Sequence, residues 1–349
     1  MKVNRPILGI TMGDPASIGP EVAVKALSEE FIYETCQPLL IGDAEVCREA
    51  IAFCGLPLTV NAVSKVSDAK FQHGTIDVYD LAYGTDSYQR GEMSAAAGNA
   101  AFITVVKAID LAMSGEIDGT VTGPINKESI HMAGHHYSGH TEIYADYTKT
   151  KKYGMLLVEE DLRVVHVSTH VSLRQACDLV KKDRILDTID LLSRACKQLG
   201  VSNPKIGVAG LNPHASDGGL FGHEEKEEIL PAVEEARRRG YNVEGPIPAD
   251  TLFPKSVGGV YDGCVVMYHD QGHIPFKLTG FKWNAEKKQM DSVKGVNITM
   301  GLPIIRTSVD HGTAFEIAGK GIASPDAMVL AIEAAVQLSK NRNNQKTPA

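Results

Sequence analysis

The sequence lacks several features that mark whole classes of protein. Its six cysteines are scattered, with no Cys-x-x-Cys pair and no disulfide-framework spacing, which favours free thiols in a reducing compartment. It has no basic run and a formal net charge of −8, so the basic face that nucleic acid requires is missing. No apolar stretch reaches membrane-spanning length, and Gly and Pro interrupt the N-terminal stretch too early for a signal peptide. We therefore expect a cytoplasmic protein without nucleic-acid or membrane partners.

Short apolar runs alternate with helical patterns along the 349 residues. Strands are predicted at Arg5–Met12, Pro38–Gly42, Thr75–Tyr79 and Gly119–Thr122, and a long helix at Ser94–Ser114. This repetition of strand, polar loop and helix predicts an α/β fold with a mainly parallel sheet covered on both faces. The length is sufficient for two such lobes.

Three later strands are each predicted to end in a histidine. The apolar runs are Leu162–Thr169, Lys205–Leu211 and Cys264–Tyr268, and the histidines are His170, His214 and His269. Sites in open α/β sheets lie beyond the carboxyl ends of the strands, so these imidazoles converge if the strands are neighbours. Three imidazoles with an open position are typical of catalytic zinc, cobalt, nickel or iron. Alternatively, each histidine donates to a nearby carbonyl.

The loop expected after Tyr268 carries the densest group of titratable side chains. Asp270, His273 and Lys277 follow His269 within nine residues, together with Gln271. Polar groups gathered behind a buried strand make this loop the first candidate for chemistry.

Two other segments have the composition of an anion site. His140 and Thr141 follow Gly139 and precede an expected helix, so an imidazole and free helix amides would face one ligand. Arg306 ends an apolar run. Its guanidinium would either bind a carboxylate or phosphate bidentately or form a structural salt bridge.

Two loops leave their roles open. Gly13–Glu21 is a Gly/Pro-rich turn into a helix but is not Gly-x-Gly-x-x-Gly, so the dinucleotide fingerprint is absent; the turn either faces an anion or only reverses the chain. Asp250, between prolines and an apolar pair, would be an oxygen ligand, a carboxylate that orients a ligand, or a loop cap.

Nine motifs, in order along nearly the whole chain, resemble one family. They are MGDPA (12–16), GPINKE (123–128), GHTE (139–142), STH (168–170), GLNPHA (210–215), PADT (248–251), MYHDQG (267–272), GVNIT (295–299) and RTSVDHGTA (306–314). Together they resemble the 4-hydroxythreonine-4-phosphate dehydrogenase family of vitamin B6 (pyridoxine) biosynthesis. The resemblance implies two α/β/α lobes like those of isocitrate and isopropylmalate dehydrogenases, with the active site in the cleft between the lobes and completed across a homodimer interface. We place the first lobe at residues 1–125 plus 300–349 and the second at 126–299.

The resemblance also assigns roles to residues. It makes His170, His214 and His269 the ligands of a divalent metal (Zn, Mg, Co or Mn), and it makes His140, Thr141, Lys277, Asn297 and Arg306 the substrate contacts. His311, Gly312, Thr313 and Ala314 are similar to the nucleotide-binding loop of the isopropylmalate enzymes and are assigned to NAD. Asp250, Asp270 and Lys127 are candidates for the general base.

The sequence departs from the family pattern near the expected site. Ser17 stands where the family usually has glycine, and the segment 281–294 is longer than in the biosynthetic enzymes. Gly272–Pro275 is more similar to the paralogues that act on D-threonate or D-erythronate 4-phosphate. The expected substrate is therefore either 4-phosphooxy-L-threonine or one of these two acids.

The implied reaction is an NAD-dependent oxidation of a phosphorylated 3-hydroxy acid followed by loss of CO2. Three alternatives stay open: a dihydrodiol dicarboxylate dehydrogenase of the same family, a histidine-ligated metallohydrolase that needs no NAD, and a metal-binding protein without turnover. Only the two dehydrogenase hypotheses predict that NAD is reduced when the substrate is added.

Overall fold

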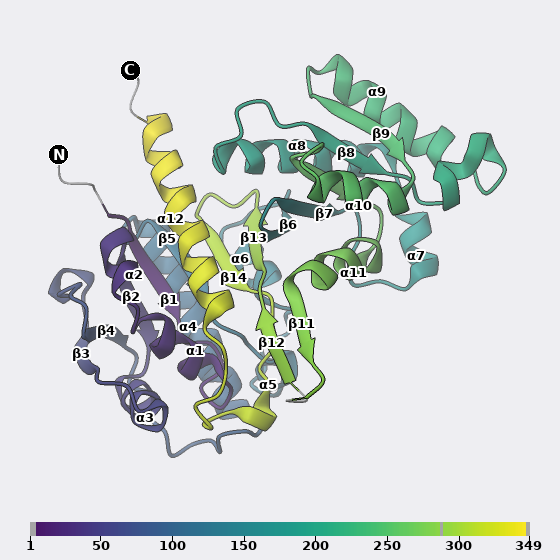
Figure 1. Cartoon of the computed structure of the whole chain (residues 1–349). Helices are drawn as coiled ribbons and strands as arrows, with labels where there is room; N and C mark the ends of the chain where they lie inside the picture. The colour runs from purple at the N-terminus through teal and green to yellow at the C-terminus, as the bar shows by residue number, and fades with distance from the viewer. Residues whose placement is uncertain (1–4, 287–288, 347–349) are drawn as a thin grey trace. The chain divides into compact units, whose positions relative to one another are not determined.

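The chain folds into two units in the computed structural model, which describes residues 5–286 and 289–346 (Figure 1). Unit 1 comprises Met1–Lys151, Ser292–Val296 and Leu302–Ala349, and unit 2 comprises Lys152–Asp291 and Asn297–Gly301. Residues 126–151, which the sequence analysis placed in the second lobe, fall in unit 1. Lys127, His140 and Thr141 therefore belong to the same unit as Arg306.

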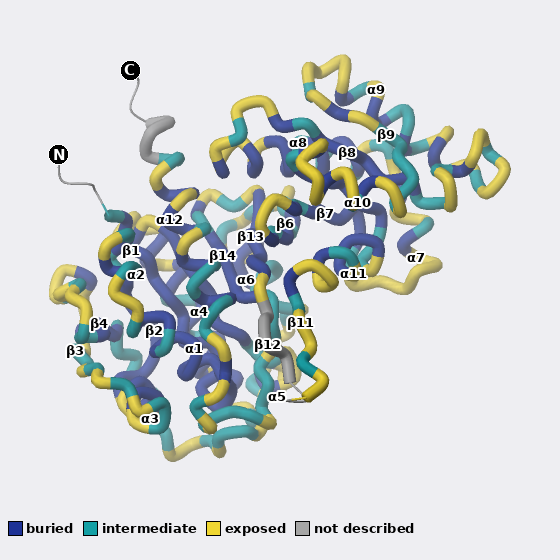
Figure 2. The backbone as a smooth tube through the Cα atoms, in the orientation of Figure 1, coloured by how far each residue is buried: buried dark blue, intermediate teal, exposed yellow. Residues whose placement is uncertain are grey.

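Unit 1 is built on a parallel sheet with the strand order β3-β4-β2-β1-β5-β14. The strands are β1 (Ile7–Thr11), β2 (Gln37–Gly42), β3 (Thr59–Val63), β4 (Thr75–Asp80), β5 (Gly119–Thr122) and β14 (Arg306–Val309). Nearly all residues of β1, β2 and β5 are buried, as expected for strands covered by helices on both faces, and Figure 2 shows buried backbone around β1. Since β5 pairs with both β1 and β14, the carboxyl ends of these three strands lie together.

Helices follow the strands of unit 1 in the order the sequence predicts. They are α1 (Gly19–Ala26), α2 (Glu30–Thr35), α3 (Ala44–Cys54), α4 (Ala95–Ser114), α5 (Lys127–Met132), α6 (His140–Tyr147) and α12 (Asp326–Lys346), with the short turns η1 (Val66–Asp68) and η4 (Phe315–Ile317). Ser94 caps α4 by accepting from the Ala97 amide, and Gly115 ends it in a left-handed conformation.

The helix α4 is the one described helix that is long and apolar enough to cross a membrane. Its Phe102, Val105 and Ile109 join the core cluster that also contains Leu39 and Ile41 of β2. A methyl group on Gly98 would collide with the Ser129 carbonyl, so α4 and α5 are in backbone contact. The helix is therefore a core helix of unit 1.

Unit 2 contains a mixed sheet with the order β13-β6-β7-β10-β8-β9. The strands are β6 (Gly154–Glu159), β7 (Leu162–His166), β8 (Ile206–Ala209), β9 (Val243–Ile247), β10 (Gly263–Val266) and β13 (Val296–Met300). The pair β6 and β7 is antiparallel, whereas β7, β10, β8 and β9 run parallel. The strands that precede His170, His214 and His269 are therefore neighbours, as the sequence analysis required.

The remaining elements of unit 2 surround this sheet. They are α7 (Leu173–Asp178), α8 (Lys182–Gln198), η2 (Pro213–Gly219), the π-helical turn η3 (Glu225–Ile229), α9 (Leu230–Arg238), α10 (Ala249–Val257) and α11 (His269–Gly280). The strands β11 (Phe281–Asn284) and β12 (Gln289–Val293) pair with each other in a separate small sheet. The long segment 281–294 is thus a hairpin, of which residues 287–288 lie outside the described residues.

One expectation near the site is wrong. Asp270, His273 and Lys277 do not lie in a loop but on the helix α11, which starts at His269. Gly272 and Pro275 suggested a loop because both residues disfavour helix interiors. Packing overrides this preference: Phe276 is fully buried, and a methyl group on Gly272 would lie 2.7 Å from Val164 Cγ1 and 2.9 Å from Val266 Cγ2. Only glycine lets α11 approach β7 and β10 so closely.

Candidate functional site

Three imidazoles pack against one another where α11 crosses β7. His269 begins the helix, His273 lies one turn later, and His166 is the last residue of β7. The rings of His269 and His273 are stacked, with centroids 3.7 Å apart and planes 8° apart. The ring of His166 lies 4.7 Å from that of His273 and 6.3 Å from that of His269. We call His166, His273 and His269 the His269 stack.

The inner part of the stack is excluded from water. His166 is 3% exposed and His273 is 8% exposed. Burial, with a smaller contribution from the neighbouring imidazoles, lowers the pKa of His166 to about 3 and that of His273 to about 4. Both rings are therefore neutral near pH 7. Neither ring nitrogen of His166 has a hydrogen-bond partner of normal geometry among the described residues.

The outer end of the stack faces a cavity of about 480 Å³. Thr169, His170, Ser172, Gln175, Tyr268, His269 and Asp270 are among the residues that line it. The rings of His170 and His269 lie 5.8 Å apart. His269 Nδ1 is 2.7 Å from Asp270 Oδ1. An ionised carboxylate only accepts, so Nδ1 carries the proton and Nε2 keeps its lone pair.

The third predicted metal ligand, His214, lies on an unusual turn. His214, Ala215, Ser216 and Asp217 have φ values of 56°, 51°, 71° and 45°. Such left-handed backbone costs a non-glycine residue about 1–2 kcal/mol. Glu225 holds the preceding loop, because its Oε1 accepts from the amides of Leu211 and Asn212 at 2.7 Å each. The His214 ring lies 6.3 Å from that of Phe221.

The chemistry of the donors in the cavity fits a divalent metal only in part. Two imidazoles and a carboxylate suit zinc or cobalt. However, within residues 5–286 and 289–346 no group of three or more His, Cys, Asp or Glu side chains is placed to hold an ion. His170 and His269 share the cavity, whereas His214 is not among its lining residues. The three-histidine site stays a prediction.

Unit 1 holds a buried cation whose side chain reaches the carboxyl end of β5. Arg306, the first residue of β14, is 3% exposed, and its Nη2 and Nε donate to Thr122 Oγ1 at 2.8 and 3.2 Å. Its guanidinium carbon lies 5.6 Å from the centre of the Tyr144 ring. Burial lowers the Arg306 pKa to about 10, so the group stays charged at pH 7.

His140 accompanies this cation at the start of α6. Burial and the charge of Arg306 lower the pKa of His140 well below its usual value, so the ring is neutral. Its Nε2 atom is buried without a hydrogen-bond partner among the described residues. Lys127 lies nearby, since a methyl group on Gly139 would be 3.8 Å from Lys127 Cε. We call Arg306, Thr122, Tyr144 and His140 the Arg306 site.

The segment assigned to NAD packs on the first loop of the chain. The Ile18 amide donates to the Thr313 carbonyl at 3.1 Å. Burial lowers the pKa of His311, whose Nε2 is buried without a described partner. Ser17 does not need glycine's freedom: it lies outside the left-handed region, and its Oγ accepts from the Gly19 amide at 3.0 Å.

Asp14, in the same loop, is a buried carboxyl that the sequence analysis did not single out. It is 0% exposed, and Oδ1 accepts from the Ala16 amide at 2.9 Å. Burial raises its pKa to about 6. Its position after a buried strand was a usable signal, but the surrounding Gly and Pro residues suggested only a turn.

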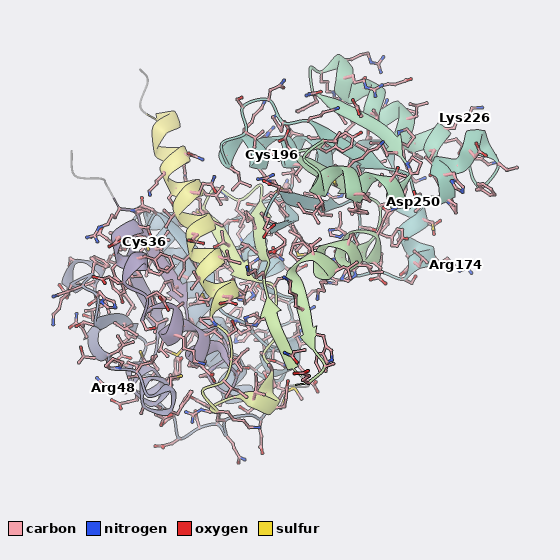
Figure 3. The ribbon with its side chains drawn as sticks, in the orientation of Figure 1. Cys36, Arg48, Arg174, Cys196, Lys226 and Asp250 are labelled. Carbon is pink, nitrogen blue, oxygen red and sulfur yellow. The ribbon has the colours of Figure 1, made fainter. Side chains whose placement is uncertain are left out.

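Three other residues predicted for the site lie on separate elements of unit 2. Asp250 is exposed near the start of α10, where Figure 3 labels it. Asn297, on β13, is buried, and its Oδ1 has no described hydrogen-bond partner. Lys277 is exposed on α11, with Nζ 5.1 Å from the centre of the Phe281 ring.

Comparison with known proteins shows that the chain is similar to dehydrogenases of one family. The family model of the pyridoxal phosphate biosynthetic protein PdxA matches residues 34–335. The D-threonate 4-phosphate dehydrogenase of Cupriavidus necator is 46% identical over 338 residues, which cover 97% of this chain and 98% of that protein.

Solved structures of related dehydrogenases are similar to this chain. A 4-hydroxythreonine-4-phosphate dehydrogenase from Klebsiella pneumoniae has a TM-score of 0.83 and 41% identity, covering 96% of this chain and 99% of that one. A terephthalate 1,2-cis-dihydrodiol dehydrogenase from Burkholderia xenovorans has a TM-score of 0.64 and 29% identity, covering 96% and 98%. The expected α/β fold and the family resemblance are confirmed, and the chain belongs to the PdxA family.

Proposed function

We propose that the protein oxidises a phosphorylated four-carbon 3-hydroxy acid with NAD and decarboxylates the product, with D-threonate 4-phosphate as the preferred substrate. The observation that carries the proposal is membership of the PdxA family together with 46% identity to a D-threonate 4-phosphate dehydrogenase over nearly the whole chain. The runner-up substrates are D-erythronate 4-phosphate and 4-phosphooxy-L-threonine, the latter because the similar solved structures carry its name.

In the Arg306 site the chain's own groups are suited to an anion. Arg306 supplies a permanent charge, and Thr122 and Tyr144 hold the guanidinium in place. The neutral His140 presents a buried nitrogen that can donate to a phosphate or carboxylate oxygen. In the proposal, Thr141, Lys277 and Asn297 supply the further substrate contacts.

The cavity in unit 2 would hold a divalent metal on His170 and His269, with His214 as the third ligand. A metal bound there would supply a Lewis acid for the substrate hydroxyl. Asp270 keeps the proton of His269 on Nδ1, so that Nε2 is available as a ligand. This orienting role makes Asp270 a weaker candidate for the general base than Lys127, and Asp250 is exposed.

The reaction balances without another reagent. The C3–H bond breaks and its electron pair leaves as hydride to NAD, while the hydroxyl proton goes to a base. The C1–C2 bond of the resulting β-keto acid then breaks, CO2 leaves, and its electron pair stays on C2, which takes up a proton. In the proposal, His311–Ala314 bind NAD, supported by their contact with the loop before α1, and the enzyme acts as a homodimer.

The test is a spectrophotometric assay of NAD reduction with D-threonate, D-erythronate and 4-hydroxy-L-threonine 4-phosphates, each with and without chelator. We expect the highest kcat/KM with D-threonate 4-phosphate and loss of activity with chelator. A higher kcat/KM for a dihydrodiol dicarboxylate would move the protein toward the terephthalate enzyme. Hydrolysis without nicotinamide reduction would favour a metallohydrolase and overturn the proposal.

A further inference from the structure

The His269 stack contains two imidazoles that the proposed reaction does not use. Only His269 reaches the cavity, whereas His273 and His166 lie behind it in the interior of unit 2. We propose that His273 and His166 are positioning residues that fix the plane of the His269 ring for ligation. This inference rests on the proposed role of His269 as a metal ligand.

Two contacts of different kinds restrain the His269 ring. At its edge, Nδ1 donates to Asp270 Oδ1 at 2.7 Å, but the Asp270 side chain is 68% exposed, so water weakens this contact. On its face, the His273 ring is stacked nearly parallel, with ring centroids 3.7 Å apart. Rotation of the His269 ring out of this plane would break the stack. The hydrogen bond to Asp270 leaves Nε2 of His269 free to bind a metal. The stack on His273 fixes the direction in which Nε2 points.

His273 can serve as a fixed platform because it is itself held. Its Nδ1 donates to the His269 carbonyl at 3.1 Å, one turn back along α11. The His166 ring lies 4.7 Å from that of His273, with ring planes 35° apart, and because His166 is also only 6.3 Å from His269 it borders the edge of the His273 ring. The platform is therefore anchored to the backbone of α11 and to the end of β7.

His166 is not explained by folding stability. Neither of its nitrogens has a described hydrogen-bond partner, and a buried polar ring without partners lowers stability. A side chain of similar volume without nitrogens would fill the same space. The backbone of α11 passes close by, since a methyl group on Gly272 would collide with His166 Nε2. We infer that the ring is retained because it lies against the edge of His273 and limits the movement of that ring.

Cobalt binding provides a readout that does not depend on turnover. The full-length protein without metal is titrated with Co²⁺, and binding is followed by visible absorption. His273→Phe keeps a flat ring but loses the hydrogen bond, His273→Asn keeps a donor but loses the ring, and His273→Leu loses both. We expect Asn and Leu to raise the Kd for Co²⁺ at least about tenfold, as loss of groups that orient metal ligands does. Phe should stay within about threefold of wild type.

His135→Leu is the matched control. His135 also stacks on an aromatic ring, that of Phe102, at 3.7 Å and 12°, but it lies in unit 1 on the loop before α6. Its removal should leave Co²⁺ affinity unchanged. His166→Leu is the second variant: we expect a melting temperature equal to or above that of wild type together with weaker Co²⁺ binding, a combination that a merely structural residue would not give.

The outcomes separate the inference from the proposed function. If the wild-type chain binds no Co²⁺, the metal role of His269 and the positioning role both fail. If it binds Co²⁺ and the folded His273→Asn, His273→Leu and His166→Leu variants bind equally well, only the positioning role is overturned. Recovery of affinity by Phe but not by Asn identifies the ring, rather than the hydrogen bond, as the positioning group.

Discussion

Burial lowers the pKa of Arg306 in unit 1 and of His166 and His273 in the His269 stack of unit 2, but it removes the charge only from the two histidines. Arg306 keeps its charge, because a pKa lowered to about 10 still lies far above neutrality. His166 and His273 lose theirs, because pKa values of about 3 and 4 lie below it. Burial therefore leaves unit 1 with a permanent cation and unit 2 with two neutral imidazoles packed beside His269. The side chain, rather than the depth of burial, decides which chemistry survives.

The largest effect should come from Arg306→Lys, which keeps the charge and removes the planar fork. A lysine cannot bond an anion bidentately and loses its charge more readily when buried, so we expect kcat/KM to fall about 100-fold or more, equivalent to about 3 kcal/mol. Steady-state kinetics measure this. Arg342→Lys, in the same unit and bonded to the Pro303 carbonyl, is the control. Unchanged kinetics of the Arg306 variant would make that arginine structural.

The second effect tests whether His214 belongs to the proposed metal site of unit 2. His214→Gly relaxes one left-handed residue and removes the imidazole, so the protein should stay folded while Co²⁺ affinity falls about 10- to 100-fold. Asp217→Gly relaxes the same turn (φ 45°) and keeps the imidazole. Equal Co²⁺ binding by both variants in a titration would remove His214 from the metal site.

A third comparison concerns how tightly helices pack in each unit. On Gly98 a new methyl group would meet backbone, with the Ile130 nitrogen at 2.6 Å, whereas on Gly272 it would meet only side chains, those of His166, Val164 and Val266. Because backbone yields less, Gly98→Ala should lower the free energy of unfolding by about 3 kcal/mol and Gly272→Ala by about 1 kcal/mol. Urea unfolding measures both, and the reverse order would contradict this account.

A fourth effect, which appears only above about pH 4, is a pH dependence specific to unit 1. The folded-state pKa of Asp14 is raised to about 6 from 3.8, so folded chains bind its proton more tightly than unfolded ones. The associated stability is present below about pH 4 and is lost as the pH rises through about 6. Asp14→Asn should therefore gain about 1–3 kcal/mol over wild type at pH 7.5 and nothing near pH 4.

Chemical denaturation at the two pH values gives the measurement. Asp110→Asn, which removes an exposed carboxylate from α4, is the control. A gain for Asp14→Asn of the same size at both pH values would show that its ionisation is not the cause.

The sequence predicted the neighbouring strands of unit 2 better than the surroundings of the candidate residues. Arg306 was singled out because an arginine after an apolar run is conspicuous, and His170 and His269 because they follow predicted strands, which do pair in the structure; the roles of these residues stay predictions. His166 was missed because it lies inside the run LRVVHVST and resembled a core position. The helical state of His273 was missed because Gly272 and Pro275 disfavour helices locally. Only the tertiary contact with β7 reveals why they are tolerated.

The left-handed turn at His214 has a thermodynamic consequence for any molecule that binds there. Four consecutive non-glycine residues hold a conformation that each would leave if released. A ligand that engages His214 while allowing even one of them to return to negative φ would gain roughly 1 kcal/mol of affinity from the relaxation alone. The turn thus stores conformational strain, and only a ligand whose binding lets the backbone relax gains affinity from it.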